Sequence, residues 1–274
     1  MKIFLLLGSV LLLSCNNKFK LAVPITFKEQ ATELHVLGTK KRQMKFGNFN
    51  TSKIRRGIQA SYLGWGRGFD MANLLLNFVG LQKTELVRKE KASFNYTLSD
   101  GITGAEVVGE EKEVTRSTEY KLRNSRSLFE SYEQTQDYKY IFSALINLNG
   151  LPGNNTWELL MTNLYERQKD PNPGILTIIK PEDNGVVTNG TDSFFIKTVI
   201  LRETETASGK TGVFPFDMLG GYEVRTSDGV AAIIDVVGSN IWFYNDLHSK
   251  DRLLVSAIAT AIFARRLNDV TWGR

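Results

Sequence analysis

The segment Leu253 to Ala264, LLVSAIATAIFA, constrains the fold of this chain more than any other feature of its sequence. Only Ser256 and Thr260 interrupt its apolar residues, and a helix that is apolar on all sides must be buried on all sides. The segment is too short to cross a bilayer, which takes about 20 residues. We therefore predict a buried helix over about residues 250–267, capped by Ser249, inside or tightly under a curved sheet.

Outside this segment, apolar residues recur with a period of two, which is typical of strands with one buried face. The strongest local prediction is a long hairpin in which residues 138–148 and 157–161 flank a loop rich in Asn, Gly and Pro. A second hairpin is predicted at Asp228-Gly229 between two alternating runs. Further strands are expected over residues 94–98, 175–180, 193–203 and 241–244.

These patterns predict a mainly β fold, an antiparallel curved sheet, sandwich or barrel, with one buried apolar C-terminal helix. The order of hairpins and helix over residues 222–267 resembles the layout of tubby-like and scramblase-like proteins, in which such a helix threads a β-barrel. This resemblance covers under a fifth of the chain. It implies phospholipid-headgroup binding by basic residues, which no motif locates.

The N-terminus reads MKIFLLLGSVLLLSC, with a basic Lys2 and an apolar stretch typical of a signal peptide. Residues 12–15, Leu-Leu-Ser-Cys, resemble the lipobox of bacterial lipoproteins and contain the chain's single cysteine. The resemblance implies cleavage before Cys15, acylation of Cys15 by chains such as palmitate, and a cell-envelope location. Asn16 favours the outer membrane. The alternative is an ordinary secretory signal in which Cys15 is incidental.

This reading divides the chain into a signal peptide (1–14), a lipid-anchored tether (15–30) and a single β-rich domain (31–274). Charge is uneven along it, because residues 16–60 carry ten Lys and Arg against two Glu. Basic residues close to a membrane anchor favour anionic headgroups. A solvated charged face is the alternative. An exported protein with modest net charge is not expected to bind nucleic acid.

One cysteine and two histidines leave little for metal or nucleophilic chemistry, so we expect no metal site, no cofactor and no catalytic triad. Carboxylates are the remaining catalytic resource, and two at a fixed separation suffice for a glycosidase. Asp235 is the one predicted within an apolar strand, where it must pair or have a raised pKa. We expect a structural role for it. The other acidic residues considered are Asp217, Glu223, Asp228 and Asp246.

The most suggestive surface cluster lies in residues 54–69, where arginines alternate with aromatic residues on a segment punctuated by glycines. Arginine forks bind phosphate or carboxylate, and aromatic faces stack on sugars. The alternative is a flexible loop whose aromatic residues cover a sheet edge. The candidate ligand-binding residues are Arg55, Arg56, Tyr62, Trp65 and Arg67.

Together these features predict a non-enzymatic envelope lipoprotein with a binding or scaffolding domain. Its lipid would make the membrane one partner, and an anionic lipid or glycan is the ligand considered. Two alternatives stay open: a carboxylate-dependent hydrolase of envelope glycans, and a subunit of an envelope assembly whose edge strands pair with a partner protein.

Overall fold

The computed structural model describes residues 20–66, 81–122, 131–151, 155–171, 173, 179, 182–205 and 211–267. Before the long strands come β1 (Lys20–Leu21), α1 (Ile25–Lys28), β2 (Ala31–His35), β3 (Lys45–Phe46), β4 (Phe49–Thr51), β5 (Arg55–Arg56) and β6 (Ala60–Gly66). The central part holds β7 (Leu81–Ser99), β8 (Gly104–Leu122), β9 (Ser131–Asn149), β10 (Thr156–Glu166) and the 3-10 turn η2 (Arg167–Lys169). The last elements are β11 (Asn184–Thr188), β12 (Ser193–Glu205), β13 (Thr211–Thr226), β14 (Gly229–Asp235), β15 (Asn240–Tyr244) and the helix α3 (Ser249–Ala264).

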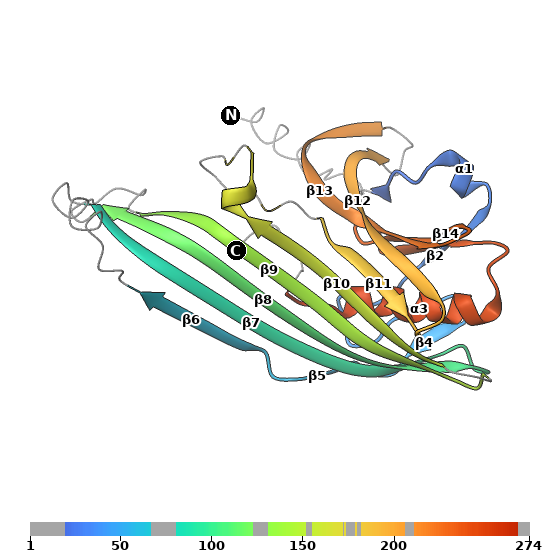
Figure 1. Ribbon diagram of the computed structural model, residues 1–274. Coiled ribbons are helices and arrows are strands. Elements are labelled where there is room, and N and C mark those ends of the chain that lie inside the picture. The colour runs from blue at the N-terminus through green and yellow to red at the C-terminus, as the bar shows by residue number, and fades with distance from the viewer. Residues whose placement is uncertain are drawn as a thin grey trace, which may run out of the picture.

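All described strands belong to one antiparallel sheet, in the order β2-β15-β14-β13-β12-β11-β10-β9-β8-β7-β4-β3. Strand β1 pairs with β12, and β5 and β6 both pair with β7. The two ends of this order meet, because Leu37, just after β2, exchanges backbone hydrogen bonds of 2.9 and 3.0 Å with Lys45 in β3. The sheet therefore curls into a nearly closed, barrel-like shape around α3 (Figure 1). The predicted fold class is confirmed.

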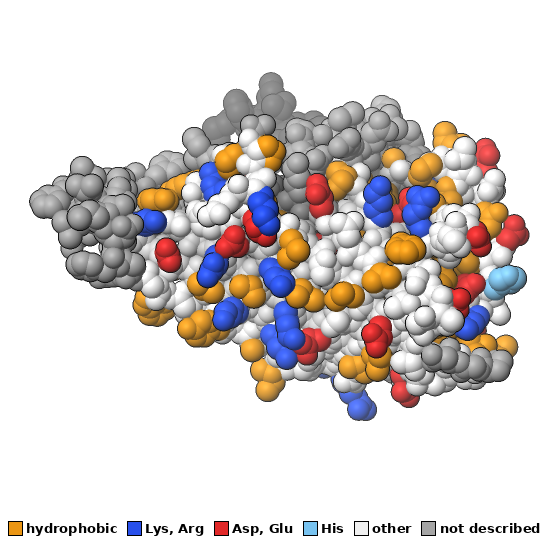
Figure 2. All heavy atoms as spheres, viewed as in Figure 1, with side chains coloured by type: hydrophobic (Ala, Val, Ile, Leu, Met, Phe, Trp, Pro, Cys, Tyr) orange, Lys and Arg blue, Asp and Glu red, His pale blue; other side chains and the backbone are white. Residues whose placement is uncertain are grey.

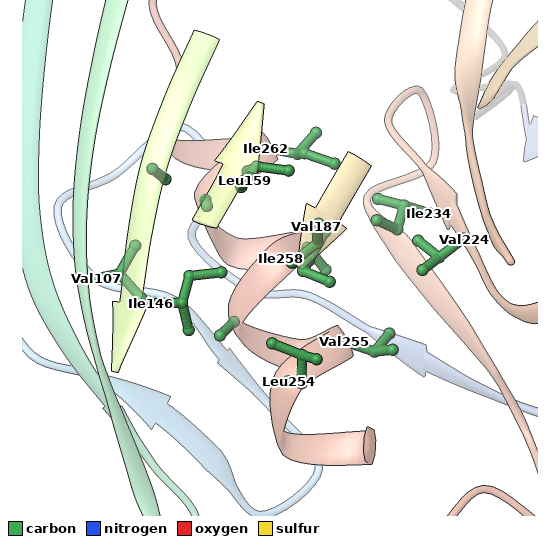
Figure 3. Packing of buried hydrophobic residues seen from close by; sticks show 14 of the residues in the cluster. Val107, Ile146, Leu159, Val187, Val224, Ile234, Leu254, Val255, Ile258 and Ile262 are labelled. Atoms are coloured by element: carbon green, nitrogen blue, oxygen red, sulfur yellow. The ribbon is translucent and has the colours of Figure 1, made fainter. Parts of the chain in front are cut away.

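Helix α3 fills the inside of this curl. Its residues from Leu253 to Ile262 are all buried, Ser256 and Thr260 included. The two hydroxyl groups are satisfied within the helix, since Ser256 donates to the Arg252 carbonyl and Thr260 to the Ser256 carbonyl. Around the helix lie inward side chains from β8 to β11 and from β13 to β15 (Figure 3). Each buried Leu or Ile is worth about 1.5–3 kcal/mol relative to an exposed one, so α3 contributes much of the core.

Both predicted hairpins form. Trp157 of β10 pairs with Ile146 of β9, and β13 turns into β14 at Ser227 and Asp228 with a bulge after Val224. The predicted strands 94–98, 193–203 and 241–244 lie within β7, β12 and β15, whereas most of 175–180 falls outside the described residues. The helix ends at Ala264, earlier than predicted. Its N-cap position is His248, without a side-chain capping bond, so Ser249 is the first helical residue and not its cap.

The segment predicted as a tether differs from expectation from Lys20 onward. Leu21 and Val23 are buried in a second apolar cluster with Leu201 of β12 and Ile233 of β14. This cluster is separate from the core around α3. Two apolar residues in a short segment suffice to hold it on the sheet, because each finds an apolar contact on the strands beneath. The predicted tether is thus folded after residue 19.

Three strands, β7 to β9, extend well beyond the helix and form a long projection with β6 along one side (Figure 1). We call this projection the blade: β6, Leu81–Lys91, Lys112–Leu122 and Ser131–Lys139. The remainder of the sheet with α3 is called the barrel region. None of the described blade side chains is a buried apolar one. Its buried residues are Thr115, Ser117 and Thr118.

No helix among the described residues is long and apolar enough to span a membrane.

Candidate functional site

The first two residues of the predicted ligand-binding cluster point to opposite faces of the sheet. Arg55 pairs with Asn95 and Arg56 with Phe94, and successive residues of a strand face opposite sides. Phe94 is buried in the core, so Arg56 points inward, where its Nη1 donates to the Ala264 carbonyl at 2.6 Å. Arg56 therefore serves the C-terminal end of α3, while Arg55 is exposed on the outer face.

The aromatic members of that cluster are also separated, because the segment expected to be a loop is strand β6. Tyr62 pairs with Lys89 and Trp65 with Leu86, which places the two rings on opposite faces. The Lys89 ammonium lies 6.0 Å from the centre of the Tyr62 ring. Arg67 lies outside the described residues. The structure does not bring the four described members together into one binding site.

The structure gathers a different set of cations at the place where the sheet closes. We call it the basic patch: Lys40, Lys41, Arg42, Lys45, Lys53 and Arg55, all exposed.

The backbone brings the parts of the patch together. A turn at Gly38, which has a φ of 85°, is closed by the Lys41 N–H donating to the Gly38 carbonyl at 2.8 Å. The Ile54 N–H donates to the Arg42 carbonyl at 2.7 Å, which places Lys53 and Arg55 beside this turn. The buried side chains Met44, Phe46 and Ile54 fix the outward direction of their neighbours.

Electrostatics make the basic patch unusual within this molecule. No Asp or Glu occurs between Glu33 and Asp70 in the sequence. No ion pair involves the six patch side chains within the described parts of the chain. On the blade, by contrast, Lys91 and Lys112 both pair with Glu110, at 3.2 and 2.6 Å. The patch cations are therefore available to phosphate, sulfate or carboxylate groups. Sequence reasoning noted the basic N-terminal third but missed this grouping, whose signal was the Lys40-Lys41-Arg42 run.

Asp235 has the structural role expected for it. Its carboxylate accepts hydrogen bonds from the Gly238 N–H at 2.7 Å, Asn240 Nδ2 at 3.3 Å and the Leu21 N–H at 3.4 Å. Burial raises the pKa of Asp235, as the sequence predicted, although these donors oppose the rise. The side chain is 1% exposed and joins β1 to the turn after β14, so a substrate has no access to it.

The other acidic residues considered from the sequence do not converge on Asp235. Glu223 forms an ion pair with Arg225 at 2.6 Å, and Asp228 and Asp246 lie exposed in turns. The side chain of Asp217 lies outside what the structure describes.

One carboxylate pair that sequence reasoning missed lies on the inward face where the blade leaves the barrel region. Glu90 of β7 is directly opposite Glu113 of β8. Such cross-strand neighbours have Cβ atoms about 4.5–5.5 Å apart. Burial, and secondly the negative charge of Glu90, raise the pKa of Glu113, while hydrogen bonds from Tyr138 and Thr115 oppose the rise. This arrangement favours a carboxyl group that keeps its proton to a higher pH than usual.

A buried polar network fixes the C-terminal end of α3 next to this pair. Arg265 donates to the Tyr222 hydroxyl at 2.7 Å and to Asp183 at 3.3 Å, and Tyr222 donates to the same Asp183 oxygen at 2.5 Å. Glu111 accepts from the Tyr140 hydroxyl and from the N–H groups of the two residues after Arg265. These bonds hold the helix end in place, so we assign the network to the fold and not to catalysis.

A pocket of about 450 Å³ is lined by residues of β10, of η2 and of the segment before β11. Asn163, Tyr165, Asp170 and Glu182 are among its lining residues. Lys169 also lines it and pairs with Glu166 at 2.8 Å. No cluster of three or more His, Cys, Asp or Glu able to hold a metal occurs in the described parts of the chain.

Comparisons with known proteins return nothing that matches this chain: no family, no curated protein and no solved structure. The resemblances to bacterial lipoproteins and to tubby-like proteins therefore stay predictions from the sequence.

Proposed function

We propose that this protein is a lipoprotein of a bacterial outer membrane, held by acyl chains on Cys15, whose non-enzymatic β domain binds an anionic lipid or glycan through the basic patch. The observation that carries the binding role is the set of six exposed cations without ion-pair partners among the described residues.

The length of chain between Cys15 and β1 determines how close the domain would lie to the membrane. Five residue steps from Cys15 to Lys20 span at most about 18 Å, even fully extended. The domain would then lie close to the bilayer surface. Lipid anchoring at Cys15 would thus keep the domain at the membrane.

The charge of the basic patch supports an anionic partner. Each Lys or Arg near an anionic surface contributes about 1 kcal/mol, and the effect falls within a Debye length of about 8–10 Å. Six such residues on adjoining segments are enough for selective binding at moderate salt, and binding should weaken steeply as salt rises.

Two measurements test the proposal. Intact-mass analysis of the membrane fraction should show an acylated N-terminal Cys15, and a Cys15→Ala variant should leave that fraction. For binding, residues 16–274 retain every described contact, and their sedimentation with neutral vesicles, anionic phospholipid vesicles and a soluble acidic polysaccharide distinguishes a lipid from a glycan ligand.

Two matched triple variants distinguish the effect of the basic patch from the effect of net charge. Lys40→Gln, Lys41→Gln and Arg42→Gln together should weaken binding at least about tenfold. The control removes three exposed lysines elsewhere, Lys121, Lys139 and Lys197, and should change binding less than about twofold. Equal binding to neutral and anionic partners, or equal loss in both variants, would contradict the binding role.

A glycan hydrolase is the second candidate, and the observation that favours it is the Glu90–Glu113 pair, not the inaccessible Asp235. Glycosidases cleave with two carboxyl groups that flank the scissile bond, and the one that acts as acid has a raised pKa. Release of reducing ends from envelope glycans, abolished by Glu113→Gln, would support it. No release by the wild-type protein would exclude it.

A further inference from the structure

The outer edge of the blade is a strand without the usual protection against pairing. Among the described strands, β6 pairs with β7 alone, and no described strand pairs with the backbone groups on its other side. Its sequence, ASYLGWG, contains neither charge nor proline. Tyr62, Leu63 and Trp65 are 61%, 47% and 74% exposed. Edge strands of monomeric proteins are normally blunted by lysine, proline or a bulge, so this edge has the properties of an interface.

The opposite edge of the blade is protected. Beyond the end of β10, strand β9 continues through polar residues from Ser131 to Gln136, including the charged Glu133. A bulge at Gln136 interrupts its register, and η2 lies against β9. Bulges and charges of this kind prevent further strand addition. The difference between the edges marks β6 as the side at which another strand can pair.

We propose that β6 pairs with β6 of a second copy of this chain, antiparallel, about a two-fold axis that is perpendicular to the sheet and lies midway between the two copies of Leu63. A two-fold axis perpendicular to the sheet keeps each side chain on its own face, so the residue at the centre of the register must pair with its own copy. The axis at Leu63 is the one that pairs all seven residues of β6, Ala60 with Gly66 and onward to the centre.

This register places large side chains opposite small ones on both faces. On the outer face Tyr62 lies opposite Gly64 of the second copy, and on the inner face Trp65 lies opposite Ser61 of the second copy. Within each copy the Tyr62 ring lies over Gly64 of its own strand, 2.9 Å from the place of a Cβ on that glycine, so the glycine leaves room for the ring on this face. At the axis, two Leu63 side chains meet in an apolar contact.

The lack of charge in β6 favours a second copy over a charged peptide as the occupant. A strand with several like charges would repel its own copy, whereas this strand has none. A basic or acidic peptide would find no complementary charge in β6 itself. Tyr and Trp are also the residue types that most often carry interface energy, and both are exposed on this one edge. The inference does not depend on the lipid anchor or on the basic patch.

Charge substitutions at the axis test both the pairing and its register. The full chain in detergent should give a dimer by native mass spectrometry at about 1–100 µM. The same spectra report Cys15 acylation independently, so failure of the anchor and failure of the dimer are read separately. Leu63→Lys places two positive charges face to face and should shift the dimer constant at least tenfold toward monomer. Leu63→Glu should do the same with negative charges. The control is Ile102→Lys in the β7–β8 turn, a residue 92% exposed and far from β6, which should stay dimeric.

Mixing the two charged variants is the decisive measurement. Opposite charges then meet at the axis, so an equimolar mixture of Leu63→Lys and Leu63→Glu should restore a heterodimer of one copy each. A wild-type protein that is monomeric throughout this range would overturn the proposal. So would charged variants that stay dimeric, or a mixture that fails to restore the dimer.

Discussion

The barrel region and the blade share the strands β7, β8 and β9, yet they bury different kinds of side chain. In the barrel region, alternate residues such as Tyr140, Phe142 and Ile146 of β9 are completely buried against α3 or its neighbours. In the blade, the same strands bury no described apolar side chain. Figure 2 shows apolar, basic and acidic side chains interspersed on the face seen there.

This difference shows that the backbone pairing of a long strand can continue where its hydrophobic core has ended. β7 and β8 stay in register from Ser99 paired with Gly104 to Leu81 paired with Leu122. Cross-strand contacts such as the stacked rings of Tyr120 and Tyr132, 6.4 Å apart, replace core packing in the blade. We therefore expect the stability to reside in the barrel region, and binding to use exposed surfaces.

The largest expected effect comes from breaking the buried ion pair at the end of α3. Arg265→Met leaves the Asp183 carboxylate buried without this cation, and we expect a loss of about 3–5 kcal/mol in the free energy of unfolding. Urea unfolding measures it. Arg225→Met removes the cation of an exposed pair with Glu223 and should cost less than about 1 kcal/mol. Similar losses of unfolding free energy for the two variants would contradict this contrast between a buried and an exposed ion pair.

Deleting apolar volume should next separate the buried core of the barrel region from its exposed outer face. Ile258→Ala creates a cavity in the middle of α3, where the side chain is completely buried, and should cost about 2–5 kcal/mol. Leu164→Ala removes a side chain that is 64% exposed on the outer face of β10 and should cost less than about 0.5 kcal/mol. Thermal unfolding of both variants checks the difference.

Adding one methyl group to a glycine should also destabilise the barrel region more than the blade, but by a smaller free energy. A Cβ on Gly109 would lie 2.4 Å from the ring of Phe94, which is itself buried, so Gly109→Ala should cost about 1–3 kcal/mol. Gly66 in the blade has no atom within 4 Å of that position, so Gly66→Ala should be neutral or slightly stabilising. Equal denaturant midpoints for the two variants would show that Phe94 moves aside freely.

The smallest expected effect is pH-dependent and lies where the two regions meet. The folded-state pKa of Glu113 is raised above the unfolded value of about 4.3, so the folded state holds this proton more tightly. Wild-type stability should therefore fall as pH rises from about 4 through the raised pKa. The Glu113→Gln variant should not lose stability in this way, because its amide does not titrate.

The two proteins should thus have the same melting temperature below about pH 4, and the variant should be more stable at neutral pH. Because the carboxyl group is partly solvated, the gain should stay below about 1 kcal/mol. Glu106→Gln on the outer face of β8 is the control, and an equal gain there would contradict the assignment.

Much of the barrel region was predictable, because its signals are local. The alternation around Ile146 and Trp157 predicted the β9–β10 hairpin, and the apolar run after Leu253 predicted a helix buried on all sides. The blade half of β8 was not predicted, because its residues from Lys112 to Leu122 lack an apolar alternation. A strand that buries no described apolar side chain on either face has no need of that pattern.

For the candidate site, the sequence predicted which residue types are present but not which residues lie together. The sequence contained the basic residues and the glycine-punctuated aromatics, but their grouping depends on contacts between distant segments. Arg56 and Arg55 are adjacent in sequence, and the pairing of β5 with β7 sends the first to the helix end and the second to the surface. The Ile54-to-Arg42 bond, in turn, places Lys53 beside the turn that carries Lys40 and Lys41.

By itself, the sequence determined the antiparallel β architecture and the buried C-terminal helix, since both follow from hydrophobic periodicity over neighbouring residues. Only the tertiary structure decided where the sheet closes, how far the blade extends and which strand has a free edge. Those features depend on the pairing of residues far apart in the chain, such as Leu34 with Ile241 and Leu81 with Leu122, and no local pattern encodes such pairs.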